Sequence, residues 1–463
     1  EINHDSGVIH GTTSTKGSFP ALLEATNTAG SYQKEIEFIV TDFDAWKYQL
    51  ELNVTGYTEA GTVKQFPLLV ELNTSMDGFH YDQFSDADGK DLRFLTSDKS
   101  RELAYEVIEW NPEGSSYFWV LLPELKQGSS LLAIWGNPAS KERPSYSSDG
   151  SLWQDYRAVW KMDELFGKVF RDSATGYHGE IYSPANSLVN GVIGDALSTI
   201  SSSNYIELPK SAYFPEGTEQ VSLSFWAFVS GGELKDQTLL HASSAVGTHM
   251  KVQLPAEDGA LHWMTGSGGS VHDTAHPLSS FNDQWIYWTI QLDLLSGKSS
   301  IYQDGNLVLT QTGISLPFGA SVEAFRIGSE TNGAFPWEGM IDEVRISTNL
   351  EEPERIKASY HNQKPDGSDY LSMGKVKGPP IILSVTKLQS FVGKIFSSTI
   401  SSFPANEGNF SAVGLPAGLS INTGTGEISG SPVQDGQYQV TIILENEYGK
   451  VTKNLPMSVF DPS

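Results

Sequence analysis

The carboxylate of Asp342 interrupts an apolar strand pattern, which makes it the first candidate for chemistry in this chain. Branched residues alternate along residues 339–347, and this predicts a strand whose buried face carries Met340, Val344 and Ile346. Asp342 falls on the same face of that strand. A buried carboxylate is costly unless it accepts hydrogen bonds or binds a metal. Two roles are therefore open for Asp342: an acceptor of backbone N–H groups in a tight corner, or a ligand of a cation.

Paired carboxylates would indicate glycoside hydrolysis if they lay on one strand face, a few ångströms apart. Because side chains alternate along a strand, such a pair needs a spacing of two residues. The acidic neighbours considered are Asp163–Glu164, Asp342–Glu343, and Glu106 with Glu109. None has this spacing, and the adjacent ones are expected to point to opposite faces. A hydrolase would therefore need one carboxylate from each of two strands.

Aromatic and histidine side chains supply candidate sugar contacts. Phe225 is expected to face the core, which turns Trp226 to the outer face of its strand as a possible stacking platform. Trp263 and Trp337 lie beside turns. The remaining candidates are His241 and His272. A core or loop role is the alternative for each. His272 and His276 have the spacing of helical metal ligands, but their Gly/Ser/Pro-rich surroundings favour a loop.

The elements that must position these residues are short alternating strands and Gly/Asp turns, typical of an all-β sandwich. From Tyr156 to Ser347 their order resembles the laminin-G-like, concanavalin-A-like jelly roll of bacterial extracellular proteins. The motifs include Asp172-Ser173-Ala174-Thr175-Gly176, Gly191-Val192-Ile193-Gly194 and Ile341-Asp342-Glu343-Val344-Arg345. In that family the aspartates of the first and last motifs lie near a structural calcium. The resemblance thus implies that Asp172 and Asp342 bind calcium.

The chain also repeats itself. Ile428-Ser429-Gly430-Ser431 recurs as Ile9-His10-Gly11-Thr12, and matching glycines, asparagines and chain ends follow at the same offset of 419 residues. The stretches Leu415-Pro416-Ala417-Gly418-Leu419 and Thr425-Gly426-Glu427-Ile428 accompany the second copy. Together they resemble the immunoglobulin-like domain of bacterial surface proteins. Residues 381–461 hold a complete copy, whereas residues 1–42 match only its second half.

Half of an immunoglobulin sandwich cannot bury its core and leaves open strand edges. We therefore expect the chain to be one segment of a longer tandem array, cut inside a domain. Another chain could instead supply the missing strands by strand addition. A third possibility is that the half-domain packs on its neighbour.

A further β-sandwich is predicted between the half-domain and the jelly roll. Five strand patterns between residues 66 and 137 resemble a bacterial domain of unknown function that commonly precedes a laminin-G-like domain, and Ala358-Ser359-Tyr360-His361-Asn362-Gln363 belongs to the same composite. The expected fold class is thus all-β, a chain of β-sandwich domains with a central concanavalin-A-like jelly roll. The expected domains are a half-domain (1–45), the unknown-function sandwich (46–147), the jelly roll (148–363), a Gly/Pro-rich linker (364–380) and an immunoglobulin-like domain (381–463).

Composition bounds the functions that this fold could serve. The 30 Lys and Arg against 56 Asp and Glu give a net charge of −26, which would repel nucleic acid. The absence of Cys excludes disulfides, Cys-zinc sites and thiol catalysis. No run approaches the roughly 18 apolar residues of a membrane span. No signal peptide is visible in the chain, which begins at Glu1, so we expect a mature, trimmed or partial chain.

The leading hypothesis is a non-catalytic segment of a large bacterial cell-surface or secreted protein. Its calcium-stabilised jelly roll would bind a glycan or a surface protein, and the immunoglobulin-like units would act as spacers beside neighbouring domains of the same chain or another subunit. The alternatives are a structural stalk or surface filament, and a polysaccharide-degrading enzyme.

Overall fold

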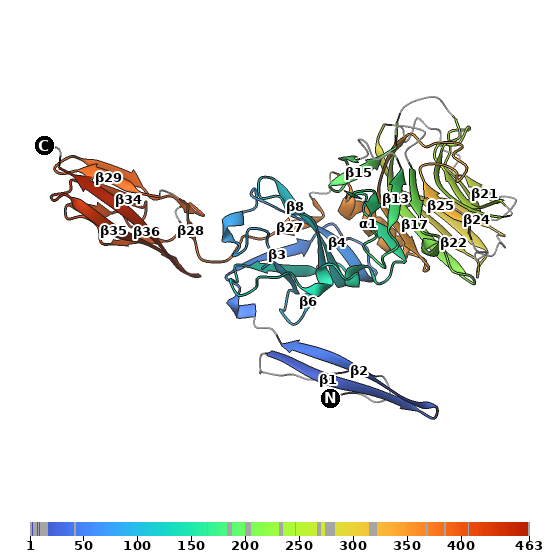
Figure 1. Cartoon of the computed structure of the whole chain (residues 1–463), viewed down its shortest axis with the longest axis horizontal. Helices are drawn as coiled ribbons and strands as arrows, with labels where there is room; N and C mark the ends of the chain where they lie inside the picture. Colours follow the sequence, from blue (N-terminus) through green and yellow to red (C-terminus); the bar gives the residue numbers. More distant parts are fainter. Residues whose placement is uncertain are drawn as a thin grey trace.

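Strands dominate the molecule, as the sequence predicts, and the all-β fold class is confirmed. The structure is a computed structural model that describes residues 2, 7, 9, 17–40, 43–163, 165–182, 188–199, 205–230, 235–245, 247–265, 270–273, 283–313, 322–365, 369–383, 386–405 and 407–461. Figure 1 shows three β-sandwiches in a row and a separate N-terminal hairpin. The jelly roll and the immunoglobulin-like domain lie at opposite ends, with a third sandwich, the middle sandwich, between them.

The N-terminal hairpin has the same register as the C-terminal one. It consists of β1 (Gly17–Asn27) and β2 (Gly30–Val40), which form a two-stranded sheet of their own. The first pair, Gly17 with Val40, corresponds at the offset of 419 to Gly436 with Val459 in the C-terminal hairpin. The two hairpins differ in how far their apolar side chains are covered. Phe38 of the N-terminal hairpin is 40% exposed, whereas its equivalent Met457 in the C-terminal hairpin is fully buried. The sequence repeat is therefore also a structural repeat, and its first copy has an uncovered apolar face.

The middle sandwich packs a five-stranded sheet against a three-stranded one. The first has the order β27-β3-β9-β5-β6 and the second β4-β8-β7. Their bounds are β3 (Tyr48–Val54), β4 (Val63–Asn73), β5 (Arg93–Thr96), β6 (Glu102–Leu103), β7 (Tyr105–Glu109), β8 (Ser115–Leu125), β9 (Ser130–Trp135) and β27 (Leu371–Met373). Leu50, Leu68 and Phe118 are among the buried residues between them.

Residues 364–380 are not a linker, contrary to the sequence prediction. β27 pairs with β3, and Tyr370 and Val376 lie in the core of the middle sandwich. Gly and Pro density suggested a linker, but the segment is bound by strand pairing to residues more than 300 positions earlier. The jelly roll is thus inserted between two strands of the middle domain, so both of its ends are fixed to the same sheet.

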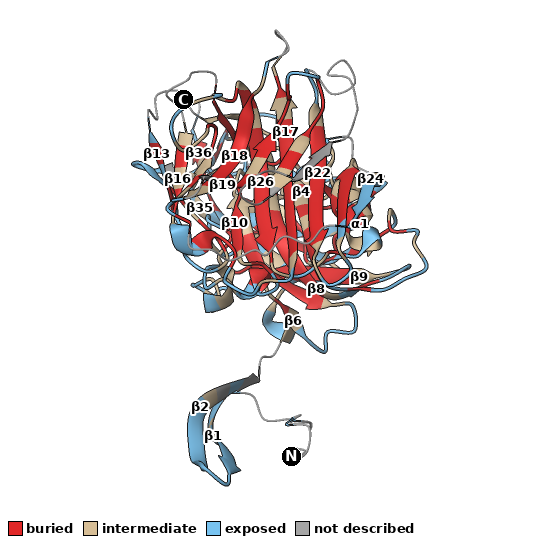
Figure 2. Cartoon of the chain, turned by 90° about the vertical axis from the view of Figure 1, so that its right-hand side faces the viewer, coloured by how far each residue is buried: buried red, intermediate tan, exposed pale blue. Residues whose placement is uncertain are grey.

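Two large sheets form the jelly roll, and the clusters of buried residues between them make its core. Sheet E has the order β14-β15-β26-β17-β22-β23-β24, with β10 also paired to β26. Its bounds are β10 (Ala158–Trp160), β14 (Leu188–Asn190), β15 (Asp195–Ser198), β17 (Gln220–Val229), β22 (Trp285–Asp293), β23 (Lys298–Gln303), β24 (Asn306–Thr312) and β26 (Gly339–Ser347). Figure 2 shows β17, β22 and β26 buried over most of their length.

Sheet F is the opposite layer, with the order β11-β12-β13-β16-β25-β18-β19-β20-β21. Its bounds are β11 (Leu165–Phe166), β12 (Val169–Phe170), β13 (Gly179–Tyr182), β16 (Tyr205–Leu208), β18 (Thr238–Ser244), β19 (Gly247–Gln253), β20 (His262–Thr265), β21 (Ser270–Asp273) and β25 (Ala324–Ile327). Ile206, Ala242 and Phe325 point into the core, so their strand neighbours point outward.

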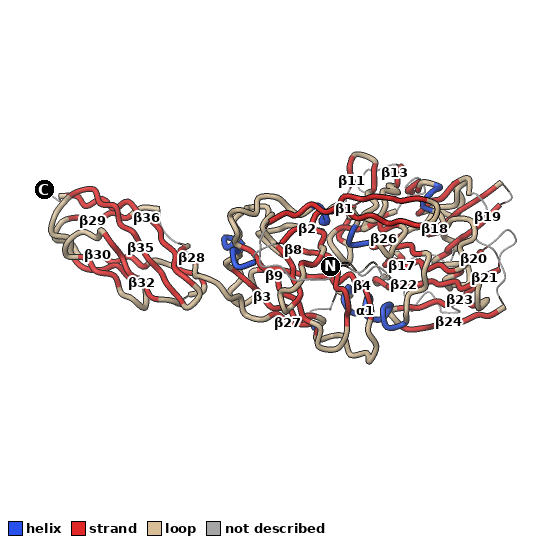
Figure 3. The backbone as a smooth tube through the Cα atoms, turned by 90° about the horizontal axis from the view of Figure 1, so that it is seen from below, coloured by secondary structure: helices blue, strands red, loops and turns tan. Residues whose placement is uncertain are grey.

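The helix α1 (Pro353–Gln363) lies between the jelly roll and the middle sandwich. It contacts β4 of the middle sandwich and β24 of sheet E, and Figure 3 shows it beside both strands. Ile356 packs on the outer face of sheet E, and Ala358 packs into the core of the middle sandwich. The other helices in the described part of the chain are the short 3-10 segments η1 (Phe43–Ala45), η2 (Tyr81–Gln83), η3 (Ser145–Ser147), η4 (Ser151–Trp153) and η5 (Lys210–Ala212).

The C-terminal sandwich is complete. Its main sheets have the orders β29-β36-β35-β32 and β30-β34-β33, beside the pair β28-β31. The bounds are β28 (Ile381–Ile382), β29 (Leu388–Phe391), β30 (Phe396–Thr399), β31 (Ser402–Phe403), β32 (Asn409–Val413), β33 (Leu419–Ile421), β34 (Glu427–Gly430), β35 (Gly436–Asn446) and β36 (Gly449–Phe460). Val440, Ile442 and Met457 belong to its buried core.

Candidate functional site

A bulge in β26 places Asp342 on the outer face of sheet E, which corrects the sequence prediction. Glu343 and Val344 together face the single residue Phe225 of β17, and Glu343 has a φ of +52°. Ile341 and Val344 both point into the core, so strict alternation fails between them. Asp342 therefore does not share a face with Val344 and Ile346. A bulge inserts one residue and reverses the alternation, which the strand pattern alone does not reveal.

Asp342 accepts hydrogen bonds from backbone N–H groups in a tight turn, which is the first of the two roles that the sequence left open. Its Oδ2 accepts from the N–H groups of Val192 (2.8 Å) and Ile193 (3.1 Å). A Cβ on Gly191 would lie 2.6 Å from that oxygen, so the turn needs glycine to wrap the carboxylate. The side chain is fully buried, and Oδ1 has no hydrogen-bond partner among the described residues. Burial, and after it the charge of Glu343, raises the pKa of Asp342.

Both oxygens of the Asp172 carboxylate also accept hydrogen bonds. Oδ1 accepts from the N–H groups of Val159 (2.8 Å) and Ala174 (2.9 Å). Oδ2 accepts from the N–H groups of Thr175 (3.1 Å) and Tyr177 (2.8 Å). These bonds tie the turn after β12 to the start of β10. Within the described parts of the chain, no group of three or more His, Cys, Asp or Glu side chains could hold a metal ion. Calcium binding by Asp172 and Asp342 stays a prediction, and N–H acceptance accounts for most of their oxygens.

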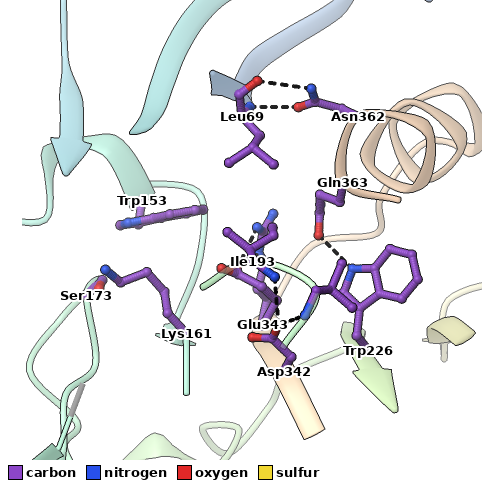
Figure 4. A network of polar contacts seen from close by, with 12 residues as sticks. Leu69, Trp153, Lys161, Ser173, Ile193, Trp226, Asp342, Glu343, Asn362 and Gln363 are labelled. Carbon is purple, nitrogen blue, oxygen red and sulfur yellow. Dashed lines mark hydrogen bonds and ion pairs between the residues drawn. The ribbon is translucent and has the colours of Figure 1, made fainter. Parts of the chain in front are cut away.

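Trp226 faces outward from sheet E, as alternation predicts, but it is not available for stacking on a sugar. Its side chain is 1% exposed, because α1 covers it. The indole Nε1 donates to Gln363 Oε1 (2.9 Å), and the ring packs against Tyr287 and Tyr360. Figure 4 shows Gln363 reaching from the end of α1 to the indole. This part of the outer face is therefore an interface between the helix and the sheet.

The middle sandwich covers a second part of the same outer face through a buried cation. Arg345 is 2% exposed, and its guanidinium carbon lies 4.5 Å from the ring centroid of Trp119 and 4.9 Å from that of Trp153. Its Nη2 donates to Glu343 Oε2 (2.8 Å), and Glu343 is 1% exposed. Burial raises the pKa of Glu343 even though Arg345 acts in the opposite direction. Trp119 belongs to β8, so this contact joins the two domains.

Glu106 of the middle sandwich holds the same junction from its other side. Its carboxylate accepts from Trp153 Nε1 (2.6 Å) and Ser173 Oγ (3.0 Å) and lies 3.2 Å from Lys161 Nζ. Figure 4 shows Trp153, Lys161 and Ser173 on the side of Asp342 that is opposite to Trp226. These hydrogen bonds and this ion pair are buried and join side chains of both domains. The junction is therefore built as a domain core and not as a flexible contact.

Trp263 and Trp337 are also buried and fill the core of the jelly roll. Trp263 is 1% exposed, and Trp337 is fully buried with its Nε1 donating to Leu254 O (2.7 Å). Their neighbouring turns suggested exposure, but the rings point inward between the sheets. His272 lies on β21 directly opposite Trp263, and its side chain lies outside the described residues, as does His276. Neither Trp263 nor Trp337 is therefore exposed at the loops, where the sequence placed them.

The outer face of sheet F carries a set of polar side chains in one row across the strands. In register order these are Glu180, Glu207, Arg326, His241 and Lys251, each directly opposite the next. Arg326 forms an ion pair with Glu207. Lys251 Nζ lies 3.1 Å from Glu330 Oε1 and 5.7 Å from the ring centroid of Phe335. Residues 330–335 thus fold over the His241–Lys251 end of the row and leave the other end open.

His241 is a structural histidine in this row. It is 3% exposed, its Nδ1 accepts from the Thr331 N–H (3.0 Å), and its Nε2 lies 3.2 Å from Thr248 Oγ1. Burial lowers its pKa to about 4. At neutral pH it is therefore an uncharged anchor for the loop above it.

At the open end of the row, two tyrosines form a partly exposed aromatic pair. Tyr182 and Tyr205 are cross-strand neighbours whose rings stack with centroids 4.8 Å apart and an interplanar angle of 14°. The guanidinium carbon of Arg326 lies 4.2 Å from the centroid of Tyr205, and Tyr182 remains 39% exposed. We call Tyr182, Tyr205, Glu207 and Arg326 the tyrosine platform.

The sequence analysis missed this platform, although the strand alternation could have found it. Ile206 and Leu208 alternate with Tyr205 and Glu207, so both polar residues must face away from the core.

Comparisons with known proteins agree with this architecture. Residues 201–357 match the family model described as "Concanavalin A-like lectin/glucanases superfamily", and residues 379–459 match the one described as "Putative Ig domain". The chain is a multidomain protein with a concanavalin A-like jelly roll and an immunoglobulin-like domain, as expected. No curated protein matches the sequence. In the described part of the chain, no helix is long and apolar enough to cross a membrane.

Several solved structures are similar to parts of the chain. A Bacteroides fragilis protein described as a putative alpha-galactosidase is 32% identical over 18% of this chain and 18% of its own, with a TM-score of 0.17. Domain 4 of the extracellular arabinanase AbnA from Geobacillus stearothermophilus, in complex with arabinotriose, is 18% identical over 44% of this chain and 97% of its own, with a TM-score of 0.31. The binding domain of Paraclostridial Mosquitocidal Protein 1 is 11% identical over 62% and 76%, with a TM-score of 0.37.

Proposed function

We propose that this chain is a non-catalytic, carbohydrate-binding segment of a bacterial cell-surface or secreted protein, with the tyrosine platform as its sugar site. The observation that carries the proposal is the partly exposed, stacked pair of Tyr182 and Tyr205 on the open end of sheet F. Sugar rings stack on aromatic faces, and nearby charged groups fix their orientation through hydrogen bonds. Arg326 and Glu207 provide a donor and an acceptor beside the rings.

The covered state of sheet E supports this choice of face. Trp226 and Arg345 lie beneath α1 and the middle sandwich, so a ligand on those parts of the outer face would have to displace a domain. The open end of sheet F needs no such rearrangement.

Binding is favoured over hydrolysis by the state of the nearest carboxylates. Glu180 and Glu207 are directly opposite across β13 and β16, so two strands do bring one carboxylate each to a single face. Glu180 is exposed, and Glu207 is held by Arg326. This pair therefore lacks the buried and unpaired carboxyl group that serves as the general acid of a glycosidase.

A glycan array of neutral oligosaccharides, screened with the whole chain, tests the proposal. Replacing a true stacking residue should cost about 2 kcal/mol, roughly thirtyfold in affinity. Tyr182→Ala should therefore weaken binding to any glycan found on the array by that factor, whereas the control Tyr448→Ala, which removes a 48% exposed tyrosine of the immunoglobulin-like domain, should not. Binding that survives Tyr182→Ala would place the site elsewhere. Release of sugar from a bound glycan would convert the assignment to an enzyme.

A structural stalk is the second candidate, and the buried junction around Arg345 favours it. A chain whose domains are locked by a core-like contact transmits force and spacing better than one with a flexible linker. If no glycan binds at any calcium concentration, the stalk takes precedence. The same array, run with calcium and with EDTA, also tests the predicted calcium dependence.

A further inference from the structure

A pocket of about 220 Å³ lies between α1 and the middle sandwich, and it shares no residue with the tyrosine platform. The loop after β3 supplies one wall, α1 supplies the second, and the residue before β27 supplies the third. The lining consists of Gly56, Tyr57, Thr58, Glu59, Lys357, Ala358, His361 and Tyr370. A cavity of about 150 Å³ is large enough for benzene, so this pocket has room for one six-membered ring.

The helical wall of the pocket is held in place by the two residues that follow His361. The side-chain amide of Asn362 makes two hydrogen bonds with the backbone of Leu69 in the middle sandwich (2.7 and 3.2 Å), as Figure 4 shows. Gln363 Oε1 accepts from an indole N–H of sheet E (2.9 Å). The sequence motif of residues 358–363 therefore ties α1 to both domains, and His361 is the member of its last turn that lines the pocket.

The hydroxyl group of Tyr370 is a buried polar group that the surrounding protein leaves unbonded. Tyr370 is 4% exposed, and its Oη makes no hydrogen bond with any residue that the structure describes. Burial, and after it the neighbouring Tyr57, raises the pKa of Tyr370, so the group keeps its proton and can both donate and accept. A buried hydroxyl without a partner costs free energy. A ligand in the pocket that bonded to this hydroxyl would recover that cost.

The imidazole of His361 is the second group available to a ligand. It is partly buried against the ring of Tyr360 (centroids 5.1 Å apart), and none of the described residues hydrogen-bonds to its ring nitrogens. Burial, and after it the charges of Lys364 and Lys357, lower the pKa of His361. The imidazole is therefore uncharged at neutral pH, where one ring nitrogen donates and the other accepts.

The charged residues of the pocket wall neutralise each other. Lys357 Nζ lies 2.6 Å from Glu59 Oε1, and the two side chains are 42% and 30% exposed. This ion pair therefore lies at the open side of the pocket, where it joins the loop to the helix. The Tyr57 hydroxyl already donates to the Gly61 C=O (2.9 Å). Because His361 is also uncharged, the pocket favours a neutral ligand. Its donors and acceptors suit hydroxyl groups, since each hydroxyl can both donate and accept.

We propose that this pocket binds one neutral sugar ring, as a carbohydrate site separate from the tyrosine platform. Tyr370 and His361 would bond to hydroxyl groups at the inner end of the pocket, and the pair of Glu59 and Lys357 would bond to others at the open side. The site does not depend on the platform, since the two lie on different domains and use different groups. A sugar held between the loop and α1 would also stabilise the attachment of the helix to the middle sandwich.

Titration calorimetry with D-glucose, D-galactose, D-xylose and L-arabinose tests the proposal on the whole chain. The chain carries Tyr182→Ala, so the tyrosine platform does not contribute. We expect at least one of these sugars to bind and to slow hydrogen exchange at the amides of residues 55–61 and 357–363. D-Glucuronate and D-glucosamine should bind at least about tenfold more weakly, because their charge would be buried without a partner. Failure of all four neutral sugars at tens of millimolar, or equally tight binding of the charged ones, would overturn the proposal.

Tyr370→Phe locates the contact, because it removes the hydroxyl group and keeps the ring. In the same background it should weaken sugar binding about fivefold or more, whereas the control Tyr448→Phe, at an exposed tyrosine, should leave the affinity unchanged. His361→Leu removes both ring nitrogens and should weaken the same sugar independently. Without sugar, Tyr370→Phe should not lower the urea midpoint, since the hydroxyl has no partner among the described residues.

Two results would contradict the pocket. Unchanged affinity in Tyr370→Phe would show that the hydroxyl does not touch the sugar, and a lowered urea midpoint would assign it a structural bond instead. The wild type separates this proposal from the tyrosine platform. Sugar binding that is present in the wild type and absent in Tyr182→Ala would belong to the platform alone. Binding that is equal in both and weakened by Tyr370→Phe would support the pocket even if the platform bound nothing.

Discussion

The outer faces of sheets E and F carry similar types of residue, but the two faces differ in how far they are covered. The outer face of sheet E carries Trp226, Glu343 and Arg345, and all three are nearly inaccessible beneath α1 and the middle sandwich. On sheet F the corresponding mixture of aromatic and charged groups, Tyr205, Glu207 and Arg326, is only partly buried.

This difference shows that outward orientation and exposure are separate properties. Alternation fixes which side of a sheet a residue occupies, but a neighbouring domain decides whether that side meets water. On sheet E the charged groups have become part of a domain core, where losing a partner is costly. On sheet F similar groups remain available for a ligand, and losing them should affect binding more than stability.

The largest contrast is expected from removing one aromatic ring on each face. Trp226→Ala should lower the free energy of unfolding by about 3–5 kcal/mol, because it leaves a cavity under α1 and an unpaired Gln363. Tyr205→Ala should lower it by less than about 1 kcal/mol, since the ring lies at a partly open surface. Urea denaturation of both variants measures the difference. Equal losses would mean that the two faces are equally covered.

Replacing one arginine on each face should give a smaller contrast. Arg345→Met leaves Glu343 buried without its cation and should cost about 3 kcal/mol. Arg326→Met breaks a partly exposed ion pair with Glu207 and should cost at most about 1 kcal/mol. The same denaturation experiment compares them. If Arg345→Met proves neutral or stabilising, the junction gains more from apolar packing than from its charges.

The pH dependence of Asp342 should be opposite in sign to that of an ordinary paired carboxylate. Its folded-state pKa is raised, so between the unfolded value near 3.8 and the raised one the native protein binds more protons, and stability falls as pH rises. Asp342→Asn keeps an oxygen for the Val192 and Ile193 N–H groups and should remove the contribution of Asp342 to this slope, at most about 1.4 kcal/mol per pH unit. The raised pKa of Glu343 should leave a slope of the same sign. Thermal midpoints of the wild type and of Asp342→Asn, measured from pH 4 to pH 8, give the two pH dependences of stability for comparison.

The same variant separates hydrogen bonding from calcium binding. If a bound cation uses Asp342, the asparagine should lower the melting temperature in calcium and abolish any shift caused by EDTA. If the carboxylate serves only the N–H groups, EDTA should leave the wild-type midpoint unchanged.

The smallest effect is expected from His241 on sheet F. Its pKa is lowered to about 4 by burial, so between pH 6.5 and pH 4 the unfolded chain binds more protons and stability falls as pH falls. His241→Asn keeps an acceptor for the Thr331 N–H and should reduce the loss between pH 7 and pH 5 by about 1 kcal/mol. A variant that titrates like the wild type would show that His241 is not the group responsible.

Much of the local architecture was predictable because it depends on spacing alone. The offset of 419 between the two hairpins fixed their common register, since turn glycines and alternating apolar residues recur at equivalent positions. The strand positions of Phe66, Phe118 and Leu131 also followed from alternation. The outward direction of Trp226 followed for the same reason.

The candidate site was less predictable, for reasons that individual residues make clear. The bulge at Glu343 reversed the faces on either side of it, so Asp342 moved away from the apolar residues beside which its sequence placed it. Trp337 lies next to a turn, yet its ring enters the core because the loop folds inward. Neither the bulge nor the inward fold of this loop corresponds to a period or a motif that can be recognised in the sequence.

By itself, the sequence determined the all-β class, the repeat and the two recognisable domain types, because these depend on periods and turn residues encoded along the chain. Only the tertiary structure decided that residues 364–380 return to the middle sheet through β27, that α1 covers Trp226, and that Tyr182 and Tyr205 stack on an open face. The physical reason is that covering and pairing depend on which distant surfaces meet, and that choice is made by the total burial of whole domains and not by the pattern of any one strand.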